Sequence, residues 1–533
     1  MATNKETKKV IAKGIDKKEA PEVVMEGKVI AIEVPDELAE AFEGFIGALI
    51  EKDKYDVSAA VERVKGSILQ LAVSLTEKIC ERTEAGEIRD LDIMADEILS
   101  DCRKTSAEII RVIIRYLNES IRNDKQTRKD MGLVIKEKDR PRQLLTHLGP
   151  IRFERDYYYD KDSGTYTIPL DQILGIEKRE RVGGSVRAAL IAQATDSSYA
   201  KSSVIVTGGA VSRQTVHDQI LKMDVPESRP YEEHKQISQL HVYADEDHAH
   251  MQKPGKEKGK KNKSVPLVTV TEGTAPLSGG RNRTIRPMHF SDENFDTKNL
   301  WKTVGGYIAR AYDTEELEKI YIHGDGGGWI RNGLEEYPQS VHVMDGYHFF
   351  KELKRICRIL PERNIRIVIT NALRKDDRRK ADLFLQELLS EPLTEKDAER
   401  IRAFAVYLFG EWNAIRRRIL EDIPGSCTEG QVSHVLSERF SRDPLGWSEE
   451  VLGKLVGARL YLKNGGTLTK EIFSEATERE ERYGDYADRL ISEVMGAGLD
   501  FSLFEVEKPV FDGASGTQTA IRGLARTRDL SLS

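Results

Sequence analysis

The stretch that decides the fold is His241-Val-Tyr-Ala-Asp-Glu-Asp-His-Ala-His250, which holds three carboxylates and three imidazoles in ten residues. Because side chains alternate between the two faces of a β-strand, its apolar residues would lie on one face and most polar ones on the other. The first set, with the residue before the stretch, is Leu240, Val242 and Ala244, and the second is His241, Tyr243, Asp245 and Asp247. Such a strand is either half of a metal site or a strand with a solvated polar face.

The segments that follow predict the rest of a sheet. Residues 264–273 and 283–292 have the pattern of two more strands, and a helix is expected around 298–312. Two further strands, in 317–330 and 340–350, each end in an aspartate. This β-β-β-α-β-α-β order predicts a mixed five-stranded sheet with helices, typical of a ribonuclease H-like core within an α+β or α/β multidomain chain.

Two further acids stand at ends of predicted elements. Asp325 ends a strand and precedes three glycines, which let the backbone or a bulky ligand approach closely. No Lys-Ser/Thr pair follows, which disfavours a nucleotide-binding P-loop, and a plain turn is the alternative. Glu429 falls in the first turn of a helix predicted after Pro424-Gly425, on the face of Val432 and Leu436. The alternative role for Glu429 is a favourable acid near a helix N-terminus.

The composition limits the class of protein. The 533 residues are 32% charged and 39% hydrophobic, which fits a soluble multidomain protein and excludes a collagen-like or wholly disordered chain. We expect no membrane-spanning helix, because no run of about 18 apolar residues occurs, and the lysine-rich N-terminus has no secretory pattern. The four cysteines form no C-x-x-C pair, which argues against a zinc ribbon or a disulfide framework. A cytoplasmic location is therefore the default.

The net charge of −7 conceals two basic segments. Lys253–Lys263 carries six lysines against one glutamate. Lys351–Lys380 carries eleven Lys and Arg against four Asp and Glu. Segments of this kind suit the phosphate backbone of a nucleic acid.

Residues 185–221 predict a helix-turn-helix. Three helices are expected at 185–195, 197–206 and 211–221, with a glycine-bearing turn at 207–210. Ser212 is the expected N-cap of the third helix. The third helix would point Arg213, Gln214 and His217 outward and Val211, Val216 and Ile220 inward. Arginine and glutamine at this place suit guanine and adenine edges in the major groove; an ordinary helical hairpin is the alternative.

The sequence predicts seven regions. Alternating residues at 152–159 and a turn at 162–164 indicate a β-hairpin, either a packing element or a surface for a phosphate backbone. The regions are a flexible tail at 1–30, a helical N-terminal domain at 31–145, the β-hairpin and helix-turn-helix DNA-binding region at 146–235, the first part of the core at 236–350, a basic helical insertion at 351–420, the second part of the core with the glutamate helix at 421–465, and C-terminal helices with a tail at 466–533.

Four motifs carry a resemblance to a known family. They are YADEDHAH, HGDGGGWI, VMDGYHFFKEL and CTEGQVSHVLSERFSRDPLGW, within about residues 140–450. These motifs resemble those of bacterial insertion-sequence transposases typified by the element Lre-two, long filed as an uncharacterised protein family and distantly similar to Mutator-type transposases. The helical N-terminus matches only loosely. The resemblance implies a DDE transposase, with the all-helical insertion seen in Mutator-type relatives.

The resemblance also assigns roles to residues. The catalytic, metal-binding carboxylates would be Asp245, Asp325 and Glu429, holding two Mg²⁺ ions for which Mn²⁺ can substitute. Reserve or supporting positions are Asp247, His248, Asp345 and His348, and Trp447 would close the core. DNA contacts would come from Arg213, Gln214, His217, Lys256, Lys258, Lys260 and Lys261. The expected partners are double-stranded DNA, as terminal inverted repeats and target, and further copies of the chain in a synaptic dimer or larger complex. No membrane partner is expected, and the chain would work in the cytoplasm at the nucleoid.

Two alternatives remain open from the sequence. One is a metal-dependent nuclease of the same fold that cuts DNA without joining it. The other is a DNA-binding regulator, in which the helix-turn-helix is functional and the carboxylates are structural. All three interpretations share the DNA-binding segment and differ in what the carboxylates do.

Overall fold

The structure of the 533-residue chain is a computed structural model. It describes residues 22–25, 28–31, 57–85, 91–228, 234–252, 262–276, 282–335, 337–421, 423–424, 427–442, 446–473, 483–484, 486 and 488–489. The chain forms two compact units, one of residues 1–181 and 477–533 and the other of residues 182–476. Each unit is described by itself. In the described part of the chain, no helix combines the length and the apolar character that a membrane span needs.

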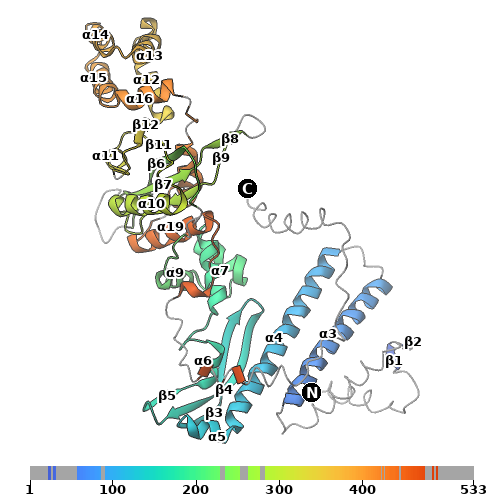
Figure 1. The fold of residues 1–533 in the computed structure, drawn as a ribbon. Coiled ribbons are helices and arrows are strands. Elements are labelled where there is room, and N and C mark those ends of the chain that lie inside the picture. The colour runs from blue at the N-terminus through green and yellow to red at the C-terminus, as the bar shows by residue number, and fades with distance from the viewer. Residues whose placement is uncertain are drawn as a thin grey trace. The chain divides into compact units, whose positions relative to one another are not determined.

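Unit 1 combines long helices with a three-stranded antiparallel sheet (Figure 1). Its elements are β1 (Glu22–Met25), β2 (Lys28–Ala31), α3 (Val57–Ala85), α4 (Leu91–Asn123), α5 (Lys125–Asp130), β3 (Leu133–Thr146), β4 (Gly149–Asp160), β5 (Thr165–Thr167) and α6 (Pro169–Leu174). The sheet order is β3-β4-β5, and α4 and α6 pack against β4. Their shared core includes Ile121, Tyr158 and Leu170.

Two expectations for this unit need correction. Residues 133–145, expected to be helical, belong to β3, the longest strand of the sheet. This strand carries an exposed charged run at 136–140, so it lacks the apolar alternation by which strands are recognised. Residues 22–30, expected as part of a tail, belong with Ala31 to the antiparallel pair β1–β2. The β-hairpin with its turn at 162–164 is confirmed, as β4 paired with β5.

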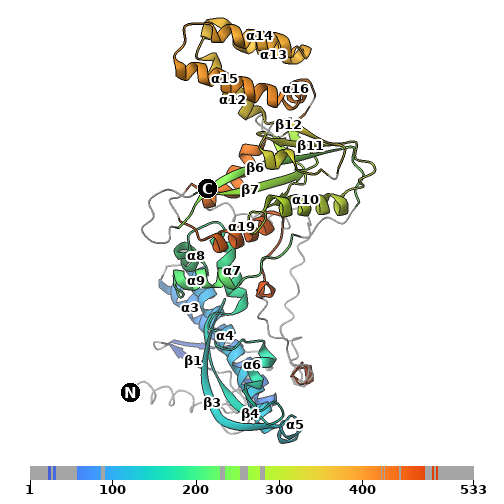
Figure 2. The ribbon, with the colours of Figure 1, turned by 90° about the vertical axis from the view of Figure 1, so that its left-hand side faces the viewer.

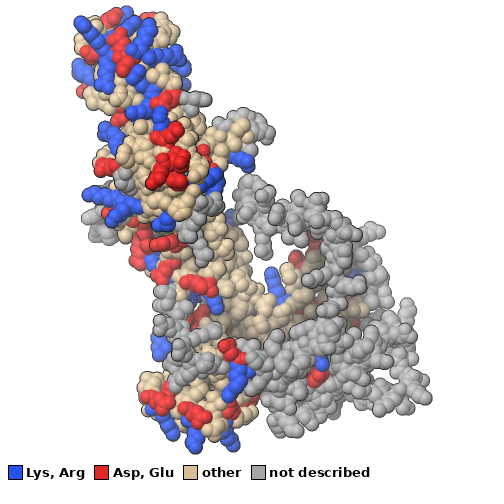
Figure 3. All heavy atoms as spheres, viewed as in Figure 1, with Lys and Arg blue, Asp and Glu red and all other residues tan. Residues whose placement is uncertain are grey.

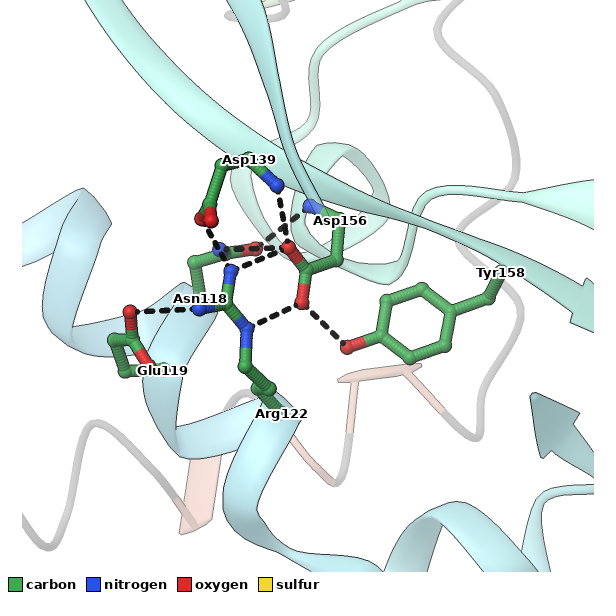
Figure 4. A network of polar contacts seen from close by, with 6 residues as sticks. All are labelled: Asn118, Glu119, Arg122, Asp139, Asp156 and Tyr158. Carbon is green, nitrogen blue, oxygen red and sulfur yellow. Dashed lines mark hydrogen bonds and ion pairs between the residues drawn. The ribbon is translucent and has the colours of Figure 1, made fainter. Parts of the chain in front are cut away.

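A buried ion-pair network joins α4 to the sheet of this unit (Figure 4). Asp156 of β4 is fully buried and accepts hydrogen bonds from Arg122 Nε at 2.7 Å and Arg122 Nη2 at 2.6 Å. The backbone N–H of Asp139 donates to the same carboxylate at 3.0 Å. Burial alone would raise the pKa of Asp156, yet Arg122 and the Asp139 amide hold it below its ordinary value. The network is therefore a structural anchor that needs the ionised acid.

Unit 2 is built on a mixed five-stranded sheet, as the sequence predicts (Figure 1). The strand order is β10-β7-β6-β11-β12; β10, β7 and β6 are antiparallel neighbours, while β11 and β12 run parallel to β6. The strands are β6 (Gln239–His250), β7 (Asn262–Thr271), β10 (Met288–Phe290), β11 (Lys319–Gly324) and β12 (Ser340–Met344). A separate small pair, β8 (Thr274–Pro276) and β9 (Asn282–Thr284), was not predicted.

The two faces of β6 are covered by different elements, and the predicted alternation is confirmed. Leu240, Val242 and Ala244 are fully buried in a cluster with α10 (Thr297–Ala311), which covers this face (Figure 2). The opposite face carries His241 and Tyr243, whose rings stack with those of the neighbouring β11. The segment that follows α17 (Thr428–Val432) packs against this second face of the sheet.

The helix-turn-helix is present in unit 2, close to the predicted bounds. Its helices are α7 (Gly184–Ala194), α8 (Tyr199–Thr207) and α9 (Arg213–Lys222). Gly208 and Gly209 have φ values of +62° and +83°, so the turn requires residues that tolerate the left-handed region. Ser212 caps α9 by accepting a hydrogen bond from the backbone N–H of Thr215 at 3.1 Å. Val216 and Ile220 are fully buried as predicted, whereas Val211 is only half-buried.

The helical insertion between β12 and α17 has a hydrophobic core of its own. Its helices are α12 (Gly346–Cys357), the 3-10 turn η1 (Pro361–Arg363), α13 (Ile365–Lys375), α14 (Arg378–Leu389), α15 (Glu395–Gly410) and α16 (Trp412–Leu420). Phe349, Ile369 and Trp412 are fully buried at its centre. Helix α16 packs against β12, which joins the insertion to the edge of the sheet. The prediction of a helical insertion is confirmed.

The last helices of unit 2 join the sheet to the helix-turn-helix. After α11 (Gly328–Arg331) and α17, they are the π-helical turn η2 (Ser433–Ser437), α18 (Glu438–Phe440), α19 (Glu449–Lys463) and the 3-10 turn η3 (Lys470–Ile472). Helix α19 packs against α7, α9 and β10. Trp447 is buried, and its indole N–H donates to the carbonyl oxygen of Phe440 at 3.0 Å. This position agrees with the prediction that Trp447 closes the core.

Candidate active site

Two of the predicted carboxylates lie at the same edge of the sheet, Asp245 on β6 and Asp325 directly after the adjacent parallel strand β11. The pairing of β6 with β11 sets Tyr321 beside His241 and His323 beside Tyr243. Two residues farther along each strand, the next side chains on this face are those of Asp325 and Asp245. Adjacent strands are about 4.8 Å apart, so the two carboxylates are neighbours at the carboxyl end of β11. The sequence separation of these residues is large, and the sheet alone brings them together.

The electrostatics of Asp245 reflect this arrangement. The pKa of the Asp245 carboxyl is raised to about 6, mainly by burial and in smaller part by the negative charges of Asp325 and Asp345. The backbone N–H of Glu246, which donates to Asp245 Oδ1 at 2.8 Å, and the nearby His348 act in the opposite direction. A carboxylate that is half-buried beside other acids is stabilised in its ionised form by a cation.

A third aspartate, Asp345, follows the next strand, β12. Asp245, Asp325 and Asp345 are together called the row below. Gly324 pairs with Met344, so Asp345 follows β12 at the level where Asp325 follows β11. The backbone N–H of Asp345 donates to the carbonyl oxygen of Gly324 at 2.8 Å. Asp345 is buried and caps α12, because its Oδ1 accepts from the N–H of Tyr347 at 2.7 Å. Part of its hydrogen-bonding capacity is thus committed to the helix start.

His348 lies in the first turn of α12 and faces this row. Its Nδ1 is 3.9 Å from Asp345 Oδ2 and is a buried atom that has no hydrogen-bond partner among the residues the structure describes. The His348 side chain is 29% exposed, so the imidazole lies between solvent and the carboxylate of Asp345. Since His348 lowers the pKa of Asp245, it acts on two of the three aspartates. Asp345 and His348, reserve positions in the sequence interpretation, therefore lie close to Asp245.

A residue of the helical insertion, Glu411, packs against the loop that follows Asp325. Gly326 has a φ of +92°, and a side chain added there would lie 2.9 Å from Glu411 Cδ. Glu411 is buried, with Oε1 3.3 Å from Arg331 Nη1 and Oε2 3.4 Å from His342 Nδ1. Burial raises the pKa of Glu411, and the charge of Asp325 adds to this effect. Sequence reasoning missed Glu411, which lies inside a predicted insertion with no motif around it.

Asp247, the reserve for the first metal ligand, has a different environment from Asp245. It is buried, and its Oδ1 accepts hydrogen bonds from Ser437 Oγ at 3.0 Å and Ser441 Oγ at 2.9 Å. These bonds fasten the helical segment after α17 to β6. His248 points elsewhere: its side chain is 60% exposed and its Nε2 lies 3.7 Å from Glu246 Oε1. Geometry thus favours Asp245 over Asp247 as the residue of the row.

Glu429 lies near the row but outside it. It is in the first turn of α17, as predicted, and α17 packs against β6. Its helix face is buried at Val432 and Leu436, whereas Glu429 itself is exposed. Cys427, two residues earlier, interacts with the Tyr243 side chain, two residues before Asp245. The start of α17 is therefore beside the strand that carries Asp245.

The described residues fit a divalent cation only in part. Among them, no group of three or more His, Cys, Asp and Glu side chains is arranged to hold a metal ion. The Asp245–Asp325 pair nevertheless has the chemistry of a magnesium site, since Mg²⁺ is often held by one or two carboxylates together with waters and substrate phosphates. A closed three-carboxylate site with Glu429 stays a prediction.

The candidate DNA-binding residues divide into described and undescribed ones. Arg213 and Gln214 are exposed at the start of α9. Gln214 Nε2 donates to Asp218 Oδ1 at 2.8 Å, and His217 Nδ1 lies 3.3 Å from the same oxygen. These hydrogen bonds, Gln214 first, lower the pKa of Asp218. Lys256, Lys258, Lys260 and Lys261 lie outside the described residues.

Comparison with known protein families assigns this chain to one of them. Residues 86–477 match the model of an uncharacterised protein family, UPF0236. The chain belongs to the UPF0236 family. A UPF0236 protein of Caldanaerobacter subterraneus subsp. tengcongensis is 34% identical over 367 residues, which cover 68% of this chain and 76% of the relative. A UPF0236 protein of Streptococcus gallolyticus, named for its place in a vanSb 3′ region, is 24% identical over 405 residues, 72% of this chain and 86% of the relative.

The names of these UPF0236 relatives state no activity, but they carry one further fact. The name of the first relative joins eleven locus designations of one genome. Another UPF0236 protein of the same organism, 32% identical over 407 residues, joins four; the match covers 75% of this chain and 84% of that relative. Several members of the family are thus present in multiple copies, which suggests a mobile element.

Proposed function

We propose that this protein is a DDE-type transposase of an insertion sequence, which binds terminal inverted repeats and catalyses Mg²⁺-dependent DNA strand cleavage and strand transfer. The observation that carries the proposal is the pair Asp245, on β6, and Asp325, directly after the parallel neighbour β11, with a raised pKa at Asp245. Neighbouring acids whose like charges repel each other at strand ends are typical of sites that bind a cation and a phosphate.

Four other observations support this proposal. The mixed five-stranded sheet, with three antiparallel strands and two parallel ones, is compatible with the ribonuclease H-like core that the sequence predicts. A helical insertion separates β12 from the Glu429 helix, as in the relatives that the motifs resemble. A helix-turn-helix with exposed Arg213 and Gln214 provides a means to read DNA ends. Multiple copies of UPF0236 proteins in one genome are expected for an element that moves.

The residues of the row divide the work of the reaction. Asp245 and Asp325 would hold Mg²⁺, with Glu429 as the predicted third carboxylate; Mn²⁺ would substitute. When bound, two such ions lower the pKa of an attacking water or 3′-hydroxyl and neutralise charge on the phosphodiester. Asp345 and His348 keep the row in place, because Asp345 caps α12 and His348 faces both Asp345 and Asp245. Glu411 supports the loop that carries Asp325.

The proposed partners follow from this chemistry. DNA would be bound as a duplex at the terminal repeats by α9, and its backbone by the basic segments, in an association that weakens with salt. Strand transfer joins two element ends to one target, so we propose that the protein acts as a dimer or larger synaptic complex on the nucleoid. Terminal inverted repeats that flank the gene would support this proposal directly.

The substitution Asp325→Asn tests the catalytic assignment. It removes one charge of the row and keeps the size of the side chain, so end binding should persist while strand cleavage in Mg²⁺ is lost. Undiminished cleavage by this variant would reject the assignment. Wild-type protein that cuts a donor with terminal repeats and gives no joined products would indicate a nuclease, and Mg²⁺-independent binding without cleavage of any substrate would indicate a regulator.

A further inference from the structure

An exposed strip of two aromatic and three basic side chains runs along one face of α12. The buried face of this helix, with Phe349, Leu353 and Ile356, packs into the core of the insertion. The opposite face presents residues spaced three and four apart, which lie above one another on a helix. These residues, called the α12 strip below, are Tyr347, Phe350, Lys351, Lys354 and Arg358.

The aromatic members of the α12 strip are unusually open to solvent. Tyr347 is 51% exposed and Phe350 is 41% exposed, although large aromatic side chains contribute most to stability when buried. Lys351 Nζ lies 5.0 Å from the centre of the Tyr347 ring, and Arg366 Cζ lies 5.7 Å from that of Phe350. Each ring therefore stands beside a cation and keeps part of its surface free.

The basic members of the strip are not neutralised by neighbouring acids. Among the described residues, no carboxylate forms an ion pair with Lys351, Lys354 or Arg358, whereas Arg355, off the strip on the same helix, pairs with Glu352 at 2.5 Å. Figure 3 shows Lys and Arg gathered over the helical insertion, at the top of the view. The strip thus combines ring faces with free positive charge.

The strip begins at the acidic row. Tyr347 is two residues from Asp345 and donates its backbone N–H to that side chain at 2.7 Å. His348, the next residue, lowers the pKa of Asp245 through its charge. A strand whose phosphate lies at the row would therefore have its next nucleotides beside Tyr347 and Phe350.

We propose that the α12 strip binds the DNA strand that is cut, with an unpaired base against Tyr347 and Phe350 and its phosphates along Lys351, Lys354 and Arg358. This inference rests on the proposed function. It adds that the two DNA strands are separated beside the phosphate that is cleaved. Ring faces are useless to a stacked duplex, whereas every unpaired base offers a face of its own for stacking. The three cations favour a polyanion. The two exposed rings favour a nucleic acid with unpaired bases over an acidic peptide that has no ring to stack.

The test measures binding of two fluorescein-labelled DNA probes by anisotropy in EDTA, so that no cleavage is needed. One probe is a blunt duplex, and the other is the same duplex with an unpaired thymidine tail. The variants are Tyr347→Ala/Phe350→Ala and Lys351→Ala/Lys354→Ala/Arg358→Ala. The matched controls are Arg400→Ala, on α15 and paired with Asp397, and Leu383→Ala, an exposed apolar residue on α14.

We expect the aromatic variant to lose about tenfold or more in affinity for the tailed probe and to bind the blunt probe as wild type does. The basic variant should lower the salt dependence of tailed-probe binding, by about 2 in the slope of log affinity against log salt for three phosphate contacts. Both controls should match wild type. Circular dichroism of each variant checks that the fold is kept.

Equal binding of the tailed probe by wild type and both strip variants would overturn the inference, and so would a wild type that does not prefer the tailed probe. These outcomes are independent of the proposed function. If the strip variants bind the tailed probe as wild type does while Asp325→Asn abolishes cleavage, the transposase proposal remains intact. A strip that binds the tail in a protein that never cleaves DNA retains the binding surface and removes the catalytic proposal.

Discussion

Ser441 donates a hydrogen bond of 2.9 Å to Asp247, although the two residues are 194 positions apart in the chain. Ser437 donates to the same oxygen at 3.0 Å. The strand that carries Asp245 and the helical segment that follows Glu429 are therefore fastened to each other directly. Asp247 thus has a structural role that its neighbour Asp245 lacks.

This relationship predicts a loss of stability on removing Asp247. Asp247→Ala should lower the free energy of unfolding by about 2 kcal/mol, because the buried hydroxyls lose a charged acceptor. Ser441→Ala should cost less, since Ser437 still donates. Chemical denaturation of both single variants and the double variant forms a double-mutant cycle. Strictly additive effects would show that the hydrogen bond carries no coupling energy.

Two of the three glycines after Asp325, Gly326 and Gly328, should respond differently to substitution. Gly326→Ala should impair cleavage severely, because the residue has a φ of +92° and its new side chain would meet Glu411. Gly328→Ala is the matched control: it meets nothing within 4 Å and should cleave as wild type does. Cleavage rates on a common DNA substrate give the comparison. Similar rates for the two variants would contradict the packing of the loop against Glu411.

Glu411 itself predicts a positioning effect on the reaction. Glu411→Ala should reduce cleavage by roughly 10- to 100-fold through misplacement of the Asp325 loop. Glu411→Gln should retain more activity, since the amide keeps an oxygen acceptor for Arg331. The exposed Glu399 on α15 provides the control Glu399→Ala, which should be neutral. A Gln variant that is as slow as the Ala variant would mean that the charge, and not the position of the side chain, matters.

His289 predicts a stability loss in acid that has a defined direction. Its pKa is lowered to about 4, mainly by burial and in smaller part by the charge of Lys463. The unfolded chain binds a proton near pH 6.5, so the folded state binds fewer protons between about pH 6.5 and 4. Stability should fall by up to about 3 kcal/mol as the pH drops through this window.

His289→Gln isolates this contribution. The amide can still bond to Thr269, whose hydroxyl lies 2.9 Å from His289 Nδ1, but it does not titrate. The variant should lose less stability than wild type between pH 6.5 and 4 in denaturant titrations. His434→Gln is the control, because His434 is 75% exposed. An unchanged pH dependence in His289→Gln would show that His289 is not kept neutral by the fold.

The exposed end of α9 predicts two kinds of DNA contact. Arg213→Ala should weaken binding to element ends by about 1–3 kcal/mol and reduce the preference for them over unrelated DNA. Lys201→Ala, on the exposed side of α8, should weaken both DNAs equally, as expected for a phosphate contact. Competition binding with both DNAs distinguishes the two. Equal losses from Arg213→Ala on both DNAs would remove its base-reading role.

Much of unit 2 follows from local sequence signals. The two faces of β6 could be predicted because its apolar residues alternate with polar ones, and Ser212 could be predicted as a cap because it precedes an amphipathic run. The aspartate row depends on which strands pair and in what register. That information is non-local, so the sequence indicated the acids and the pairing of β6 with β11 made them neighbours.

The features that were missed lack such signals. Strand β3 contains Pro141 and an exposed charged run, and its pairing with β4 is irregular at Glu137 and Arg140, so no two-residue period survives. Glu411 reaches the site only because the insertion folds back on β12. For Glu429, the helical period placed Val432 and Leu436 correctly on a buried face, but a residue one turn earlier lies beyond the edge of the packed surface.

Helix α19 has a consequence for the spacing of recognition and cleavage. Lys454 Nζ donates to the carbonyl oxygens of Leu221 and Met223 at the end of α9, at 2.8 and 2.7 Å. Asn464, at the other end of the helix, exchanges two hydrogen bonds with the backbone of His289 in β10. Helix α19 thus joins the DNA-recognition helix α9 to the sheet. In a transposase built this way, the protein itself would measure a constant number of base pairs from the recognised sequence to the cut.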